Sequence, residues 1–272
     1  MKPIVKWAGG KRQLLPVIKE MMPKNFGRYY EPFFGGGALY CELKPNDAVI
    51  NDFNKQLINV YQQVKDDVNK VCAYLKTLES TYNECTDIAD KDNMYYTIRS
   101  IFNSCIKGNI YDAASASRFI FLNKAGFNGL YRVNISGEFN VPPAHRKTIK
   151  LFDAKDIALL SEQLGKTRIM CGDFEKACMD AKEGDFIFFD SPYYDTFDTY
   201  QAGGFSEVDH LRLFGLFKKL SDKGVYCMLT NNDCDFIKYM YKNYNIKEVD
   251  VKRMINCDSK KRTGKEIIIT NY

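Results

Sequence analysis

The chain has 272 residues, 45% of them hydrophobic, and a net charge of +5, so it can bury the core of one large domain or of a domain with an insertion. It has no apolar run of membrane-spanning length, and glycines and charges interrupt its first residues, so we expect no signal peptide and a cytoplasmic protein. Nine cysteines without a C-x-x-C pair, beside only two histidines, argue for free thiols and against a zinc site.

The first predicted elements are typical of a nucleotide-binding unit. Residues 28–43 (RYYEPFFGGGALYCEL) indicate a strand, a glycine turn at residues 35–37 and the start of a helix. The next strand ends on Asp52, whose carboxylate could accept hydrogen bonds from ribose hydroxyls, and a helix follows Asn54. Tyr40 breaks the G-x-G-x-x-G spacing, which argues against a dinucleotide cofactor. Such a turn is also often purely structural.

The segment from 56 to 165 interrupts this pattern. Most of it is polar with helical periodicity, and N-G, S-G and P-P pairs then predict a hairpin within residues 126–143. We interpret residues 56–165 as an inserted, mostly helical subdomain between residues 1–55 and 166–272.

The remaining elements restore the alternation of strands and helices. Strands are predicted at 167–172, 185–190, 224–231, 245–255 and 265–272, with an amphipathic helix between Ser206 and Gly224. The pattern predicts an α/β fold with a doubly wound, mainly parallel sheet.

Basic residues gather in two stretches. Residues 118–150 and 252–265 each hold six Lys or Arg against one acid, while the rest of the chain is net negative. This distribution suggests a polyanionic partner, although solvated surface loops explain the charge alone equally well.

Two short motifs suggest chemistry. In KWAGGKRQLL (residues 6–15), Trp7 offers an aromatic surface and Lys11 with Arg12 could bind an anion, although a loop with a core tryptophan is an alternative.

In FIFFDSPYYD (residues 186–195), a strand would deliver Asp190 at its carboxyl end. A carboxylate and a backbone carbonyl could together orient a planar amine, on which Tyr193 stacks. A capped strand end is the simpler reading of this motif alone.

Taken in chain order, KWAGGK, EPFFGGGAL with NDFN, DSPY and FNGLYRVNISGEFNVPP resemble the Dam-type (D12 class) adenine-specific DNA methyltransferases over almost the whole chain. The resemblance implies a seven-stranded, Rossmann-like methyltransferase sheet, S-adenosylmethionine as cofactor and double-stranded DNA as partner. It also implies that residues 1–55 and 166–272 form the catalytic domain and that residues 56–165 form the DNA target-recognition subdomain. The substrate would be the N6 amine of a flipped adenine in GATC, and the enzyme would act as a monomer.

The resemblance also assigns residues. The cofactor would contact Trp7, Ala8, Gly9, Gly10, Lys11, Phe34, Gly35, Gly36, Gly37, Asp52, Asp173, Phe174 and Asp190. The catalytic set would be Asp190, Ser191, Pro192 and Tyr193. The DNA-binding set would be Lys6, Phe127, Asn128, Leu130, Arg132, Asn134 and Pro142. Arg132 would read a guanine edge, Phe127 and Asn128 would fill the gap left by the flipped base, and Leu130 with Pro142 would contact a thymine methyl.

Ser191 departs from the family pattern, which has proline there. Serine keeps the carbonyl that accepts from the target amine, but it loses the fixed φ and adds an N–H and a hydroxyl that need partners. We therefore expect reduced or altered activity. Three alternatives stay open: a DNA-binding protein with impaired catalysis, a nicotinamide-dependent oxidoreductase, and a methyltransferase that acts on RNA or on a protein glutamine.

Overall fold

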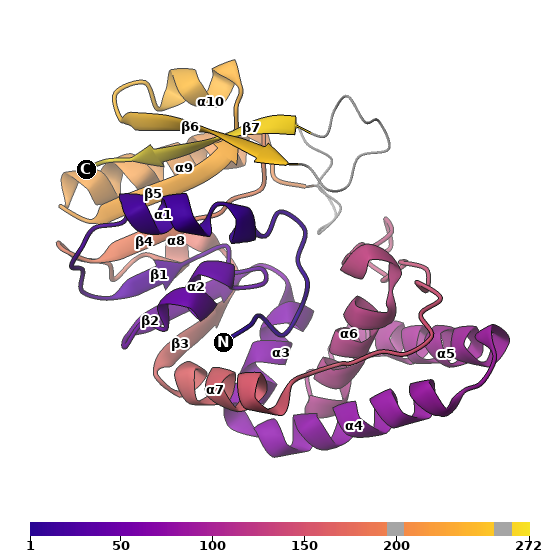
Figure 1. The fold of residues 1–272 in the computed structure, drawn as a ribbon. Coiled ribbons are helices and arrows are strands. Elements are labelled where there is room, and N and C mark those ends of the chain that lie inside the picture. Colours follow the sequence, from indigo (N-terminus) through magenta and orange to yellow (C-terminus); the bar gives the residue numbers. More distant parts are fainter. Residues whose placement is uncertain (195–203, 253–262) are drawn as a thin grey trace.

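The structure is a computed structural model that describes residues 1–194, 204–252 and 263–272 (Figure 1). Within these residues, seven strands form one sheet in the order β3-β2-β1-β4-β5-β7-β6. The strands are β1 (Tyr29–Glu31), β2 (Ala48–Asp52), β3 (Thr167–Cys171), β4 (Phe186–Phe189), β5 (Tyr226–Asn232), β6 (Asn245–Lys252) and β7 (Thr263–Thr270). Most of the basic stretch at 252–265, the end of the strand predicted at 245–255, and Cys257 lie outside the described residues.

The first five strands run parallel, and the prediction of a mainly parallel, doubly wound sheet is confirmed. Glu31 of β1 lies opposite Ile50 of β2, and Tyr30 lies opposite Ile187 of β4. Strand β7 pairs antiparallel with both β5 and β6. The chain order reverses between β1 and β4, and in such sheets the ligand crevice lies outside the carboxyl ends of the strands at this point.

Alternate strand residues face opposite sides of the sheet, as the pleat requires. Tyr29, Phe186 and Phe188 join a core that includes residues of α1 (Leu15–Met21) and α2 (Ala38–Leu43). Tyr30 and Ile187 face a second core with α8 (Phe174–Ala177), α9 (Glu207–Asp222) and α10 (Asp235–Met240). Helix α9 begins with a capping box between Ser206 and Asp209, close to the predicted position.

Five helices lie between β2 and β3. They are α3 (Lys55–Asp66), α4 (Val68–Glu84), α5 (Ile88–Lys107), α6 (Ala113–Ala125) and α7 (Ala154–Gly165). Each begins with an asparagine or aspartate whose side chain accepts from backbone N–H groups of the first turn; the caps are Asn54, Asp67, Asp87, Asp112 and Asp153. Helices α3 and α7 pack beside β3, whereas α4, α5 and α6 extend away from the sheet (Figure 1).

The segment from 126 to 143 follows an antiparallel course but has no regular strands, so the predicted hairpin is only partly correct. It contains a short 3-10 helix, η2 (Phe127–Gly129), and two isolated bridges, Gly126 to Pro143 and Val133 to Phe139. Asn128 and Gly129 both have positive φ, 54° and 67°, and two such residues in a row interrupt a strand ladder. Asn103 of α5 holds the returning arm, because its amide pairs with the N–H and C=O of Phe139.

Eight described cysteines are free. In the described parts of the chain, no group of three or more His, Cys, Asp or Glu side chains is arranged to hold a metal ion. No helix within those parts is long and apolar enough to cross a bilayer.

Candidate active site

A cavity of about 760 Å³ opens at the carboxyl ends of β1 to β4, where the chain order of the sheet reverses. The residues that follow these four strands form its wall together with the N-terminal segment from Pro3 to Arg12. All predicted cofactor and catalytic residues lie in this wall, and so does Lys6. The fold therefore brings together residues that are up to about 190 positions apart in the sequence.

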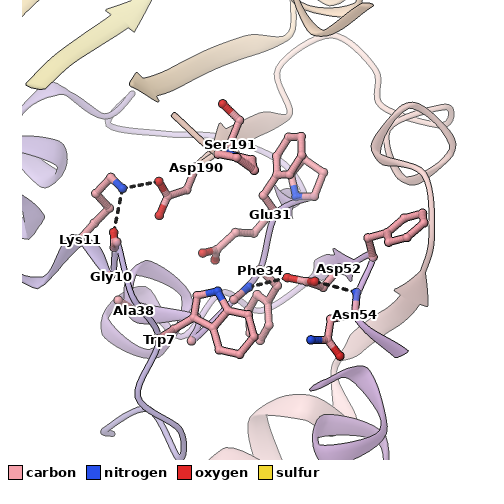
Figure 2. A pocket seen from close by; sticks show the side chains of 18 of the residues that line it. Trp7, Gly10, Lys11, Glu31, Phe34, Ala38, Asp52, Asn54, Asp190 and Ser191 are labelled. Atoms are coloured by element: carbon pink, nitrogen blue, oxygen red, sulfur yellow. Dashed lines mark hydrogen bonds and ion pairs between the residues drawn. The ribbon is translucent and has the colours of Figure 1, made fainter. Parts of the chain in front are cut away.

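The glycine turn after β1 is held tightly against its neighbours. The N–H of Gly35 donates to Oδ2 of Asp52 over 2.8 Å, and the Asn54 N–H donates to Oδ1 of the same carboxylate over 2.9 Å. Gly35 has φ 49°, and a Cβ there would lie 2.6 Å from Cδ1 of Trp7. Only glycine therefore fits beneath the indole, and the turn fixes Asp52 and Trp7 in the same wall (Figure 2).

Asp190 follows β4 and is held on one side by two donors. Its Oδ1 atom lies 2.5 Å from Nζ of Lys11 and accepts from the Thr230 hydroxyl over 3.0 Å. Lys11 is only 4% exposed, and its Nζ also donates to the Gly9 carbonyl over 2.8 Å. The other carboxylate oxygen of Asp190 points into the cavity in Figure 2. The acid predicted to bind the target amine is thus fixed in orientation, and one of its oxygens faces the cavity.

The ring of Tyr193 lies beside the same ion pair. Nζ of Lys11 is 4.8 Å from its centroid, so the ammonium contacts both the carboxylate and the aromatic face. The next residue, Tyr194, instead packs on Phe236 with ring centroids 4.3 Å apart. Tyr193 therefore lines the cavity, while Tyr194 anchors the loop to the body of the protein.

Ser191 is 2% exposed and its hydroxyl has a partner. Nδ2 of Asn231, near the end of β5, donates to its Oγ over 3.4 Å, while Oδ1 of Asn231 accepts from the Tyr194 N–H over 3.1 Å. Nδ2 of Asn232 donates to the Tyr194 carbonyl over 3.0 Å. Two consecutive asparagines thus hold the loop at Ser191 and Tyr194.

Glu31, which the sequence interpretation did not select, places a buried carboxyl group in the cavity wall. Its side chain points toward the space between Trp7 and Asp190 (Figure 2). The Tyr29 hydroxyl donates to it over 2.7 Å. Burial, with a smaller contribution from Asp190, raises the pKa of Glu31 well above its usual range. A cation bound in the cavity would offset that burial.

The opposite end of the wall is aromatic. Phe33, Phe174 and Phe205 lie with ring centroids 5.2 to 6.0 Å apart. Asp173 caps α8 through the N–H of Glu175, and its second oxygen accepts from Arg212 over 2.6 Å. Asp173 therefore already makes structural contacts at both oxygens, whereas Phe174 presents a ring to the cavity. The sequence interpretation did not identify Phe33, Phe205 or Arg212.

The predicted DNA-binding residues of the 126–143 segment lie mainly on the surface. Phe127 is 51% exposed, which removes core packing as its explanation, and Asn128 and Pro142 are exposed as well. Leu130 is half-buried and packs against the core. The segment therefore combines exposed apolar and amide groups with one half-buried leucine.

Two predicted DNA-binding side chains make hydrogen bonds within the segment. Nε of Arg132 donates to the Asn140 side chain over 2.7 Å. Asn134 closes the turn through both the N–H and the carboxylate of Glu138. Asn140 therefore holds Arg132 in place, while Asn134 serves the turn itself.

The polar residues that support the site were missed because each acts through a distant partner. Thr230 and Asn231 lie on the strand sequence YCMLTNN, and both are completely buried. Polar residues at the end of an otherwise apolar strand are the only sequence signal, since a buried polar group needs a partner. The identity of that partner depends on the sheet order.

This sheet order, with its cavity at the reversal point and an acid after β4, is that of a Rossmann-like methyltransferase. The chain belongs to the D12 class N6 adenine-specific DNA methyltransferases, whose family profile matches residues 7–255. It is 40% identical to the type II methyltransferase M1.LlaDCHI of Lactococcus lactis subsp. cremoris, over 100% of this chain and 96% of that protein. It is 38% identical to the type II methyltransferase M.MjaIII of Methanocaldococcus jannaschii, over 100% and 99% of the two chains. The retron Ec67 DNA adenine methylase of Escherichia coli is 30% identical, over 98% and 90%.

Proposed function

We propose that the protein transfers a methyl group from S-adenosylmethionine to N6 of a flipped adenine in GATC, acting as a monomer on double-stranded DNA. One observation carries the proposal. Asp190 presents one carboxylate oxygen to the cavity, while Lys11 and Thr230 hold the other. An amine bound there meets a pre-oriented acceptor beside an aromatic ring, which favours attack by its lone pair.

The cavity residues fit the cofactor. Nδ2 of Asn54 is buried in this wall and has no hydrogen-bond partner among the described residues, so it can donate to a ligand hydroxyl beside Asp52. Glu31 offers a buried acid to a cationic ligand, and the aromatic rings around Phe174 offer faces to a purine. When bound, S-adenosylmethionine supplies an activated methyl group on a sulfonium.

On the substrate side, the protein has to orient an amine whose lone pair is delocalised. The free oxygen of Asp190 and the backbone carbonyl of Ser191 would each accept one amine hydrogen, and Tyr193 would stack on the base. The amine loses one proton as its nitrogen gains the methyl group, and the hydrogen bond to Asp190 gives that proton a path away.

The segment 56–165 would serve as the target-recognition subdomain. Its exposed side chains at Phe127, Asn128 and Pro142 support this role, because an extruded base leaves a gap that such groups can fill. Arg132 would exchange its bond to Asn140 for the edge of a guanine. Lys6 lies beside this segment and would contact a base or a phosphate.

Ser191 supports a second candidate function, a sequence-specific DNA-binding protein with impaired catalysis. The bond from Asn231 to Ser191 weighs against it, because it supplies part of the restraint that proline would give. The two functions differ in turnover, not in DNA binding.

The test is methyl incorporation by the purified protein from labelled S-adenosylmethionine into a GATC duplex and into duplexes changed at each of the four positions. We expect incorporation at the adenine of GATC only. Asp190→Asn, which keeps the side-chain volume, should abolish transfer but retain cofactor binding. Specific duplex binding without incorporation would favour the second candidate, and equal incorporation into all duplexes would refute the GATC assignment.

A further inference from the structure

The side chain of Asn123, near the end of α6, joins two segments that belong to different parts of the proposed site. Its Oδ1 accepts from the Lys6 N–H over 2.8 Å, and its Nδ2 donates to the Lys6 carbonyl over 2.8 Å. The same Nδ2 donates to the carbonyl of Gly129 over 2.8 Å. Asn123 is 2% exposed, so these backbone groups would be left without partners if the amide moved.

The two joined segments also touch directly. Gly129 has φ 67°, and a Cβ there would lie 2.5 Å from Cδ of Lys6, so the segment crosses the lysine at a distance that only glycine permits. Next to this crossing, the Trp7 ring stacks on Tyr131 with centroids 5.7 Å apart, and Tyr131 stacks on Phe119 of α6 over 5.2 Å. A displacement of the 126–143 segment would therefore move Lys6 and Trp7.

We propose that Asn123 is a positioning residue that couples reading of the target duplex by the 126–143 segment to cofactor binding at Trp7, an inference that rests on the proposed function. The duplex binds the exposed face of the segment and favours one arrangement of its backbone. Asn123 transmits that arrangement to Lys6 and the neighbouring indole in the cavity wall. By linkage, the cofactor favours the same arrangement of the segment to an equal degree.

Two other asparagines make similar backbone contacts, but each holds a single segment, whereas Asn123 joins two segments of the proposed site. Asn83 pairs through its amide with the N–H and C=O of Ile149, and Asn103 pairs in the same way with Phe139. Asn103 holds the same segment as Asn123, but it holds it to α5 rather than to the cavity wall. Asn103→Ala is therefore a matched control that loosens the segment without cutting the connection to Trp7.

The chain contains one tryptophan, Trp7, so its fluorescence reports cofactor binding in the cavity wall. The ligand is S-adenosylhomocysteine, which carries no transferable methyl group. Its Kd is measured alone, with a GATC duplex, and with a duplex of equal length that lacks GATC. We expect the GATC duplex to tighten the Kd about tenfold in the unmodified protein, within the usual range of coupling between two sites.

Asn123→Ala should reduce this factor to below about twofold, while Asn103→Ala should weaken duplex binding and keep the coupling. The inference is overturned if the duplex tightens the cofactor Kd by the same factor in Asn123→Ala and in the unmodified protein. It is also overturned if Asn103→Ala loses as much of this coupling as Asn123→Ala does. Absence of any duplex effect in the unmodified protein overturns it even if methyl transfer occurs. Coupling that depends on Asn123 without methyl transfer would support the inference while the proposed function fails.

Thermal unfolding checks that each variant is folded at the assay temperature. If Asn123→Ala is not, Tyr131→Leu replaces it, because that change removes the stack on Trp7 while Asn123 keeps its bonds. Calorimetry then gives the cofactor Kd independently of the altered indole environment. Unchanged coupling in Tyr131→Leu would support the inference, because Asn123 still joins the two segments. Loss of coupling would overturn it, because the aromatic stack rather than Asn123 would then carry the effect.

Discussion

Nζ of Lys11 lies 2.5 Å from Oδ1 of Asp190 and 4.8 Å from the ring centroid of Tyr193. The sequence interpretation placed Lys11 among the cofactor residues, whereas this contact places it on the acid that would receive the target amine. This ion pair between a buried lysine and a partly exposed aspartate holds the carboxylate in one orientation, and its effect on catalysis should therefore exceed its effect on binding.

Replacing this lysine tests that role. Lys11→Met keeps the length of the side chain but removes the ammonium, so we expect single-turnover methyl transfer at saturating cofactor to slow about 100-fold, with duplex affinity nearly unchanged. Lys19→Met is the control, because it breaks the exposed ion pair between Lys19 of α1 and Glu42 of α2. Transfer by Lys11→Met at the unmodified rate would show that the pair does not orient the acid.

Asn231 should compensate for the serine in the catalytic loop. We expect Ser191→Pro to transfer methyl groups faster at saturating cofactor, and Asn231→Ala to slow transfer about tenfold because the loop loses its contacts. In the Ser191→Pro background, Asn231→Ala should slow methyl transfer by a smaller factor, because the proline ring already fixes φ at residue 191. Asn271→Ala, which removes contacts at the other end of β5, should affect stability alone. Equal losses in both backgrounds would contradict the compensation.

Arg132 should determine selectivity at one base pair. We expect Arg132→Ala to lose about 1–3 kcal/mol of discrimination at the guanine of GATC, measured as kcat/KM ratios across duplexes changed at that position. The exposed Lys147 provides the control, because Lys147→Ala should weaken binding to all the duplexes by the same factor. If guanine discrimination survives in Arg132→Ala, another residue reads that edge.

Lys124 should make folding stability depend on pH. Burial, followed by the nearby charges of Lys6 and Arg12, lowers the pKa of Lys124 from 10.5 to about 8. Between these two values the unfolded chain binds more protons at this lysine than the folded chain, so its contribution to stability rises with pH across that window.

Lys124→Met removes this dependence. We expect the variant to be more stable than the unmodified protein below pH 8, by an amount on the order of 1–3 kcal/mol that shrinks as pH rises toward 10.5. Chemical unfolding of the two proteins at matched pH values measures the difference between their free energies of unfolding. The titration of all other groups contributes equally to both proteins and cancels in this difference. A constant difference across the window would contradict the burial of Lys124.

The sequence predicted the strands well because each is a short apolar run between turn residues. FIFF and YCMLTNN lie near the centre of the sheet, and their alternate residues contribute to both cores. The caps of α3 to α7 are equally local signals, since each is an asparagine or aspartate at the start of a helical pattern. Local chemistry thus determined most of the fold.

The features that the sequence did not predict depend on long-range geometry. The contacts of Asn123 with Lys6 span 117 positions, and Asn231 meets Ser191 across 40. Asp173 matched a family position, but its pairing with Arg212 arises only when α9 packs beside α8. The 126–143 segment lacks regular strands because Asn128 and Gly129 adopt left-handed backbone conformations within its first arm. The N-G pair predicted a turn there, but it did not show that the turn interrupts an arm instead of joining the two arms.

Strand β7 follows β6 in the sequence but lies between β5 and β6 in the sheet. On the ribosome, β6 therefore emerges before the only neighbour it pairs with in the described sheet. This edge can close only after β7 has been synthesised, whereas β1 to β4, which surround the cavity, are already available. Asn231 belongs to β5, which pairs with β7 on that side. The support of the loop at Ser191 should consequently mature late in biosynthesis, and a nascent chain would form the cavity wall at β1 to β4 before this loop becomes rigid.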